Sequence, residues 1–93
     1  LELDTVHRSV RRGNRPIELT SKEFGLLEYL MKRKGVVLTR AMILDHVWDL
    51  DYDGGSNLVE VYINYLRKKV DQGADVKLIQ TVRGSGYVLK EPN

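Results

Sequence analysis

Short apolar-polar alternations dominate the first part of the chain. Val6 and Val10 alternate with polar or charged neighbours, and further along Ile17 and Leu19 flank a glutamate. A period of two is typical of strands with one buried face, and the Gly-Asn pair between the two runs is a common turn signal. Residues 1–19 therefore predict a small antiparallel meander.

Two helical segments follow the meander. Thr20 and Glu23 form a capping box, in which the threonine side chain accepts from the glutamate N–H and the glutamate side chain accepts from the threonine N–H. Apolar residues then recur every three or four positions as far as Gly35, a residue typical of a helix end. Thr39 caps the second segment, whose apolar stripe ends at Trp48. Two helices joined by a short link are thus predicted.

The longest helical pattern runs from Asn57 to about Asp71. Its apolar residues lie on one stripe, which we expect to face the core: Val59, Ile63, Leu66 and Val70. At about 100° per residue, the stripe also fixes the opposite face of the helix. That outer face holds Asn57, Val61, Asn64 and Lys68, with Tyr65 at its edge and Arg67 and Glu60 on one flank.

The composition of this outer face suggests a function. Val61 is apolar without a local reason, and Asn64 and Tyr65 are weaker helix formers than the Glu or Lys common on surface helices. An α-helix fits the major groove of DNA, where amides, small apolar groups and cations meet base edges and phosphates. The face is therefore typical of a DNA reader. A solvated face and a protein-binding face are the alternatives.

The stretch TVRGSGYVL, residues 81–89, admits two interpretations. A phosphate-binding glycine loop requires a helix directly after the glycines, but here the strand-like YVL follows. The β-rich runs 77–80 and 86–89 instead flank Arg83-Gly84-Ser85, which predicts a hairpin. An arginine near the tip of such a hairpin is suited to the negative potential of a DNA minor groove.

The amino-acid composition limits the classes of protein to which the chain can belong. A chain of 93 residues with 42% hydrophobic and 30% charged residues is typical of one globular domain. No apolar run approaches the roughly 18–20 residues that cross a bilayer, so no membrane partner is expected. The absence of cysteine fits a cytoplasmic protein. Because the chain begins with Leu1 rather than Met, we expect it to be a piece of a longer protein.

Charge is distributed unevenly along the chain although the net charge is only +2. Residues 1–40 hold nine Lys or Arg against five Asp or Glu, and residues 57–93 hold six against four. Residues 41–56 between them hold four Asp and no Lys or Arg. An acidic segment between basic flanks predicts two surfaces with different partners, or else ordinary solvated faces.

The residues that usually carry catalysis are scattered. His7 and His46 lie far apart without metal-binding spacing, and the serines lack a nucleophile motif. We therefore expect no catalytic residue, no metal site and no cofactor, and hence no enzyme. The segregation of strands from helices predicts an α+β fold, and two short-linked helices, a long helix and a hairpin are the element order of a winged helix.

Almost the whole chain resembles the DNA-binding output domain of the OmpR/PhoB family of bacterial two-component response regulators. Four segments carry the resemblance: LTSKEFGLLEYLMKRKG, LTRAMILDHVWD, NLVEVYINYLRKKV and IQTVRGSGYVL. It implies a winged helix-turn-helix with a four-stranded N-terminal antiparallel sheet, three helices and a C-terminal β-hairpin wing. Residues 1–93 would be this effector domain. The implied receiver domain, phosphorylated by a sensor kinase, would precede it.

The resemblance also implies site residues, with residues 57–70 as the recognition helix in the major groove. The family positions that contact bases correspond to Val61, Asn64 and Tyr65 in this chain. Arg83 corresponds to an arginine that enters the minor groove. The resemblance implies phosphate contacts at Trp48, Asn57, Leu58, Arg67, Thr81 and Tyr87. Lys68 is added to this set because it lies on the outer helix face.

The chain departs from the family pattern on the recognition helix. Better-studied members often carry Arg-Arg where this chain has Asn64-Tyr65, and Arg-Thr where it has Asn57-Leu58. Because a tyrosine cannot make a bidentate contact to guanine, we expect a weaker preference for guanine at that step. Because Asn57 lacks the charge of the arginine found there in other members, we expect modest affinity for each DNA half-site. Binding would then depend more on two copies of the domain binding together.

The implied partners are promoter DNA with tandem direct repeats, a second copy of the domain on that DNA, the receiver domain and RNA polymerase. The polymerase is expected at the acidic loop through Asp49, Asp51, Tyr52 and Asp53. A solvated turn rich in Asp and Gly is the alternative for that loop. For the whole chain, the alternative function is a winged-helix module that binds protein without specific DNA binding.

Overall fold

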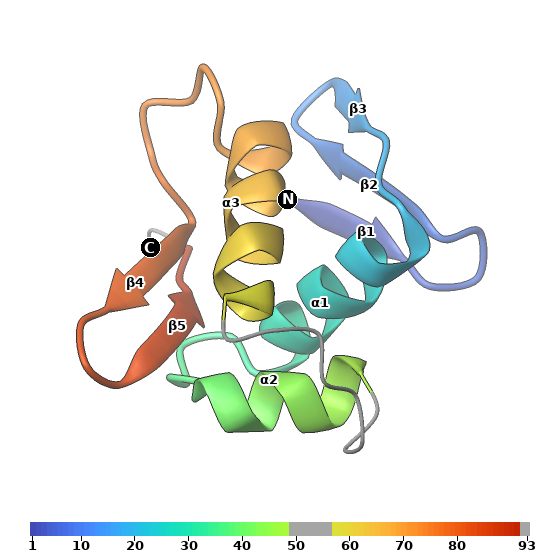
Figure 1. The fold of residues 1–93 in the computed structure, drawn as a ribbon. Helices are drawn as coiled ribbons and strands as arrows, with labels where there is room; N and C mark the ends of the chain where they lie inside the picture. Colours follow the sequence, from blue (N-terminus) through green and yellow to red (C-terminus); the bar gives the residue numbers. More distant parts are fainter. Residues whose placement is uncertain (49–56, 92–93) are drawn as a thin grey trace.

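The computed structural model describes residues 1–48 and 57–91, and these contain two antiparallel sheets and three helices (Figure 1). The N-terminal sheet comprises β1 (Glu2–Asp4), β2 (Ser9–Arg12) and β3 (Arg15–Ile17). The helices are α1 (Ser21–Lys32), α2 (Arg40–Val47) and α3 (Leu58–Val70). A hairpin of β4 (Ile79–Val82) and β5 (Gly86–Leu89) completes the order. The predicted α+β order, the three helices and the C-terminal hairpin are confirmed.

The N-terminal sheet has three strands in the described residues, so the implied count of four is wrong there. Asp4 Oδ1 accepts from the backbone N–H of Val6 at 2.9 Å and of His7 at 3.2 Å, which closes a turn where alternation predicted strand. Val6 is accordingly 83% exposed. After β3 the chain passes directly to Thr20 at the start of α1, which leaves no length for a further strand between β3 and α1.

The capping box at the start of α1 is confirmed. Thr20 Oγ1 accepts from the Glu23 N–H at 3.3 Å, and Glu23 Oε1 accepts from the Thr20 N–H at 2.9 Å. Lys69 Nζ on α3 also donates to Glu23 Oε1 at 2.6 Å. Burial acts to raise the pKa of Glu23, but the hydrogen bonds from Lys69 and Thr20 outweigh it and hold the pKa below its ordinary 4.5. The buried carboxylate therefore stays ionised and joins α1 to α3.

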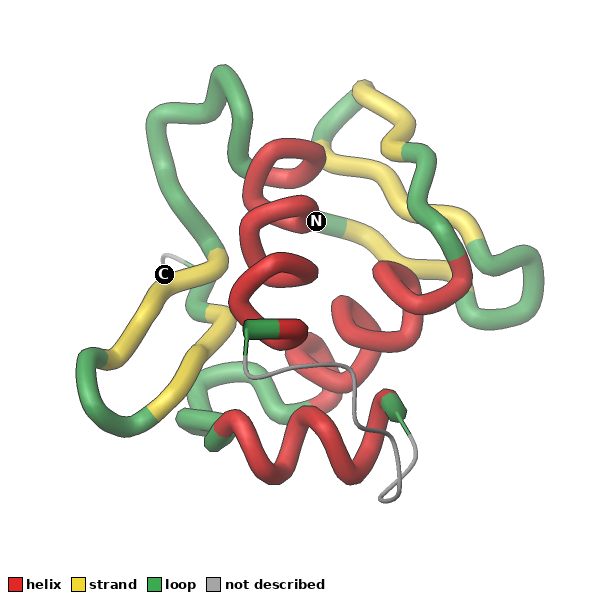
Figure 2. The backbone as a smooth tube through the Cα atoms, in the orientation of Figure 1, coloured by secondary structure: helices red, strands yellow, loops and turns green. Residues whose placement is uncertain are grey.

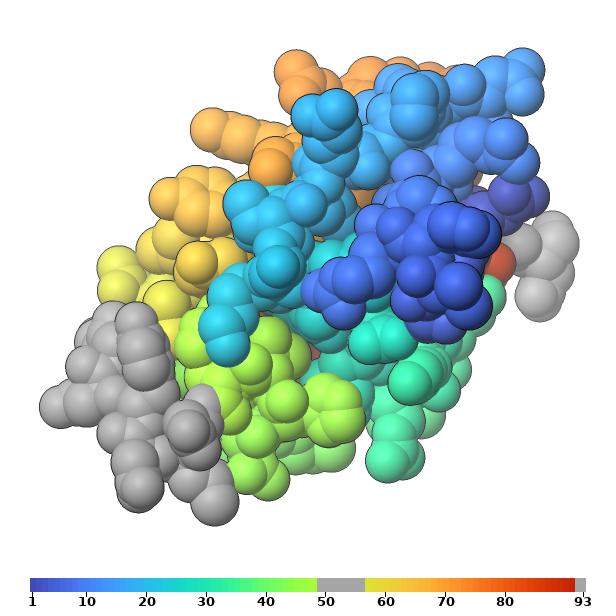
Figure 3. Space-filling view, turned by 90° about the vertical axis from the view of Figure 1, so that its right-hand side faces the viewer, coloured from blue at the N-terminus to red at the C-terminus, as the bar shows by residue number. Residues whose placement is uncertain are grey.

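The three helices separate the two sheets. Figure 2 shows the N-terminal strands on one side of α3 and the hairpin on the other, with α2 crossing below. Figure 3, turned toward the sheet side, shows the N-terminal strands (blue) at the surface above α2 (green). The predicted α3 stripe lies in the core with no exposed surface: Val59, Ile63, Leu66 and Val70.

The hairpin is attached to the link between α1 and α2. Leu38 and Tyr87 exchange two backbone hydrogen bonds of 2.7 and 2.9 Å, and the Gly35 N–H donates to Leu89 O at 2.9 Å. At Gly86, where φ is 151°, a Cβ would lie only 2.0 Å from Leu38 O. A glycine is therefore required at this position for the hairpin to approach the link so closely.

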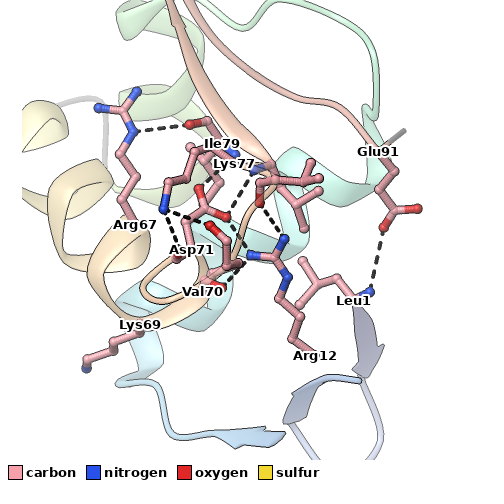
Figure 4. A network of polar contacts seen from close by, with 12 residues as sticks. Leu1, Arg12, Arg67, Lys69, Val70, Asp71, Lys77, Ile79 and Glu91 are labelled. Atoms are coloured by element: carbon pink, nitrogen blue, oxygen red, sulfur yellow. Dashed lines mark hydrogen bonds and ion pairs between the residues drawn. The ribbon is translucent and has the colours of Figure 1, made fainter. Parts of the chain in front are cut away.

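The C-terminal end of α3 is held by Asp71, which is 3% exposed (Figure 4). Its carboxylate accepts from the backbone N–H groups of Leu78 at 3.0 Å and Ile79 at 3.2 Å. It also accepts from Arg12 Nη1 of β2 at 2.9 Å, and the same guanidinium donates to Val70 O and to a carbonyl before β4. One buried carboxylate therefore connects α3, the N-terminal sheet and the start of the hairpin.

Replacing Asp71 with alanine should destabilise the fold strongly. Asp71→Ala removes the acceptor of two buried N–H groups and the charge partner of a largely buried guanidinium, so we expect a loss of about 3 kcal/mol in the free energy of unfolding. Asp75→Ala, at an exposed aspartate a few residues away, should stay within about 0.5 kcal/mol. Urea denaturation measures both variants. Similar small effects would contradict the role given to Asp71.

Two glycines of the hairpin should respond differently to the same substitution. Gly84 has φ 77° and open space around it, so Gly84→Ala should cost about 1 kcal/mol through backbone strain alone. Gly86→Ala adds the collision with Leu38 O and should cost at least about 3 kcal/mol. The comparison is made by thermal or urea unfolding. Equal costs at the two positions would show that the hairpin is not packed closely on the link.

Candidate nucleic-acid interface

The outer face of α3 is oriented as the apolar period predicts. Asn64 and Lys68 are exposed, Tyr65 is 47% exposed and Val61 is half-buried. Asn57 precedes the helix and is exposed, and its side chain makes no capping bond to α3. Leu58 is half-buried in the first turn. Amide, aromatic and ammonium groups therefore share one open side of the helix, while contact of these residues with DNA stays a prediction.

Arg67 connects this helix face to the hairpin. Its Nε donates to Ile79 O at 3.2 Å, and its Nη2 donates to Thr81 Oγ1. Its Nη1 donates to Asn64 Oδ1 at 3.5 Å, and the guanidinium lies 5.9 Å from the centre of the Tyr87 ring. Three predicted phosphate-contact residues, one each from α3, β4 and β5, thus lie together at one corner, beside a predicted base-contact residue.

Two predicted phosphate-contact residues belong mainly to the core. Trp48 is 7% exposed at the C-terminal end of α2, and Tyr87 is 9% exposed on β5. Burial raises the pKa of the Tyr87 phenol, and the nearby Glu60 carboxylate adds to the effect. The phenol therefore stays protonated and remains a hydrogen-bond donor. Both rings therefore offer little surface for contact with a ligand.

Arg83 is exposed in the turn of the hairpin. The turn is closed by a hydrogen bond from the Ser85 N–H to Val82 O at 2.9 Å, and Gly84 supplies the positive φ of 77°. The predicted interpretation of RGS as a hairpin tip is confirmed. The short turn places a cation at the tip of the hairpin, and Arg67 attaches the stem of this hairpin to α3.

The C-terminal half of α3 is flanked by two grooves in which cations outnumber carboxylates. A groove of about 520 Å³ lies between α3 and β4, and its charged lining residues are Arg67, Lys68 and Lys77 against Asp71. A second groove of about 250 Å³ lies between α3 and β3, and its charged lining residues are Arg15, Lys68 and Lys69 against Glu18. An excess of positive charge on both sides of an exposed helix suits a polyanion better than a basic or neutral partner.

Tyr62 was missed by the sequence interpretation as a part of the outer face. Its ring packs edge-on against Trp48, with 5.0 Å between ring centres, and against Tyr65, with 5.6 Å. The i, i+3 spacing of the two tyrosines was the available signal, because residues three apart are neighbours on a helix. Tyr62 is half-buried, and its ring therefore contacts both a buried and an exposed aromatic side chain.

Both histidines of the described residues contact a neighbouring side chain. His7 Nδ1 pairs with Asp4 Oδ2 at 2.8 Å, and the His46 ring stacks on Tyr29 at 3.9 Å. In residues 1–48 and 57–91, no group of three or more His, Cys, Asp or Glu side chains is placed to hold a metal ion. No helix in that part of the chain is long and apolar enough to cross a membrane. The loop predicted for polymerase contact, with Asp49, Asp51, Tyr52 and Asp53, lies outside the described residues.

Comparison with known sequences identifies the family of the chain. The family model described as "Transcriptional regulatory protein, C terminal" matches residues 14–89. The response regulator MprA of Mycolicibacterium vanbaalenii is 52% identical over 91 residues, which cover 98% of this chain and 39% of that protein. The probable transcriptional regulatory protein TcrX of Mycobacterium tuberculosis is 51% identical over 90 residues, 97% of this chain and 38% of that protein. The chain thus spans about two fifths of the length of these relatives.

Solved structures share the fold. The DNA-binding domain of RstA from Klebsiella pneumoniae, determined in complex with the RstA box, has a TM-score of 0.83 and 32% identity, covering 95% of this chain and 88% of that one. The DNA-binding domain of the response regulator AdeR, in complex with an intercistronic region, has a TM-score of 0.84 and 27% identity, covering 98% and 94%. The fold is the winged-helix fold of response-regulator DNA-binding domains.

These matches agree with the four segments that carry the sequence resemblance. The family consists of transcription regulators, a non-enzymatic class. The chain belongs to the family of C-terminal domains of transcriptional regulatory proteins, the OmpR/PhoB type of output domain.

Proposed function

We propose that this chain binds double-stranded DNA in a sequence-specific manner, as the output domain of a two-component transcription regulator. The observation that carries the proposal is the junction at Arg67, which joins the exposed face of α3 to the stem of the hairpin. An exposed helix with basic flanks and a cation-tipped arm beside it match a major groove, its phosphates and a neighbouring minor groove. The RstA and AdeR domains, both solved with DNA, have the same fold.

Each candidate residue has a role in this proposal. Val61, Asn64 and Tyr65 meet base edges in the major groove, and Arg83 enters the minor groove. The phosphate contacts proposed are Trp48, Asn57, Leu58, Arg67, Lys68, Thr81 and Tyr87. Arg67 and Thr81 act as a pair, because their hydrogen bond fixes the guanidinium beside the hydroxyl before DNA arrives. Such preorganisation lowers the entropy cost of binding.

The assembly around the domain is also proposed. The curated relatives are named as response regulators, so we assign to the full-length protein an N-terminal receiver domain phosphorylated by a sensor kinase. On DNA, two copies bind tandem direct repeats in a promoter. The acidic loop with Asp49, Asp51, Tyr52 and Asp53 contacts RNA polymerase, since its charge disfavours phosphate. A protein-binding winged helix without DNA affinity is less favoured by the basic flanks of α3.

The salt dependence of duplex binding tests the proposed function. Each neutralised phosphate should add about −0.9 to the slope of log K against log salt concentration. We expect a slope of at least roughly −3 on any duplex, because Arg67, Lys68 and Arg83 lie on the proposed surface. Fluorescence anisotropy across a salt series gives the slope. A flat response, or no binding to any duplex, would support the protein-binding alternative.

Removal of the hairpin cation should weaken DNA binding without affecting folding. Arg83 is exposed, so Arg83→Ala should cost roughly 1–3 kcal/mol of binding free energy and change stability by less than about 0.5 kcal/mol. Arg11→Ala is the matched control, because Arg11 lies on the N-terminal sheet and pairs with Glu2 at 2.7 Å. Anisotropy titration compares the variants. Retained affinity in Arg83→Ala would remove the hairpin tip from the interface.

A further inference from the structure

A series of three aromatic rings extends from the core to the proposed reading face. Trp48 is buried, Tyr62 is half-buried and Tyr65 is 47% exposed. The ring planes of Trp48 and Tyr62 meet at 72° with 5.0 Å between centres, and those of Tyr62 and Tyr65 meet at 69° with 5.6 Å. Both pairs have the edge-to-face geometry that aromatic quadrupoles favour. The exposed ring is therefore connected to the core through one intermediate side chain.

The exposed ring needs such a connection if it is to discriminate bases. An arginine makes two fixed hydrogen bonds to guanine, whereas a tyrosine offers one hydroxyl and an apolar ring. Discrimination by Tyr65 therefore depends on where its ring is held. An exposed side chain on a helix exchanges between rotamers, and freezing it on binding has an entropic cost. A neighbour that holds the ring beforehand removes part of that cost.

We propose that Tyr62 is a positioning residue that fixes the ring of Tyr65 for base discrimination, with Trp48 as its buried support. The inference rests on the proposed function and deepens it. Tyr62 is three residues before Tyr65 on α3, so the two rings are neighbours on the helix surface. The Trp48 ring, which is buried at the end of α2, packs edge-on against Tyr62 and supports it from the core side. The ring of Tyr62, rather than its hydroxyl, performs this role.

The test measures the ratio of affinities for two duplexes, one recovered from a random pool by the unaltered chain and one of scrambled sequence. Tyr62→Leu removes the supporting ring and should lower this ratio by roughly three- to tenfold, the cost of ordering one freed side chain. Tyr62→Phe keeps the ring and should hold the ratio within about twofold of the unaltered chain. If the ratio of affinities fell equally in Tyr62→Leu and Tyr62→Phe, the role would belong to the hydroxyl, and the inference would be overturned.

A double-mutant cycle separates action through Tyr65 from direct contact with DNA. In a Tyr65→Ala background, Tyr62→Leu should cause no further loss of the ratio, because the positioned ring is already absent. An equal loss with and without Tyr65 would overturn the inference. Tyr29→Leu is the matched control for general destabilisation. Tyr29 is a buried aromatic residue on α1 that stacks on His46, so the ratio of affinities for the two duplexes should not change in this variant. A comparable loss in this control would also overturn the inference.

A measurement without DNA covers the case in which Tyr62→Leu does not fold. The χ1 couplings of Tyr65, read by NMR in the free domain, should report one rotamer in the unaltered chain and in Tyr62→Phe. Rotamer averaging in the unaltered chain would overturn the inference while leaving DNA binding intact. Failure of the proposed function has a different result, namely no salt-dependent binding of the unaltered chain to any duplex, and it would remove the basis of this inference too.

Discussion

The carboxylate of Asp71 is the interaction on which the arrangement of the two sheets depends. It ends α3, accepts two backbone N–H groups of the segment that becomes β4, and pairs with Arg12 of β2. A buried carboxylate is stable only when its acceptor capacity is used, so these donors are held in one geometry. The direction in which the chain leaves α3, and hence the place of the hairpin, follows from that geometry.

Arg67 and Gly86, together with Asp71, fix the position of the hairpin on the helices. Arg67 attaches the middle of β4 to α3, one helical turn before Asp71. Gly86 lets β5 approach the link at Leu38, so the far side of the hairpin is fixed as well. With attachments on both strands, the hairpin cannot rotate about α3 as a free arm. The spacing between Arg83 at its tip and the exposed face of α3 is therefore a property of the fold.

Sequence reasoning predicted the features that depend on local rules. The period of α3 gave its buried stripe and outer face, and the Thr20–Glu23 pair gave the start of α1. The bond between Arg12 and Asp71 joins residues 59 apart in the sequence, and no local pattern specifies such a partner. Val6 was placed in a strand because its alternation is real, but the Asp4 side chain takes the backbone N–H groups that the strand would need.

The basic residues of the chain serve two tasks, which a count of charges cannot separate. Arg12 and Arg15 donate to carbonyl groups at the C-terminal end of α3, where cations also offset the helix dipole. Lys69 is paired with the buried Glu23 carboxylate. These cations contribute to the field over the interface but are committed to bonds within the fold. Because few cations on the proposed surface remain for phosphate, selectivity depends more on the placement of side chains such as Asn64 and Tyr65 than on net charge.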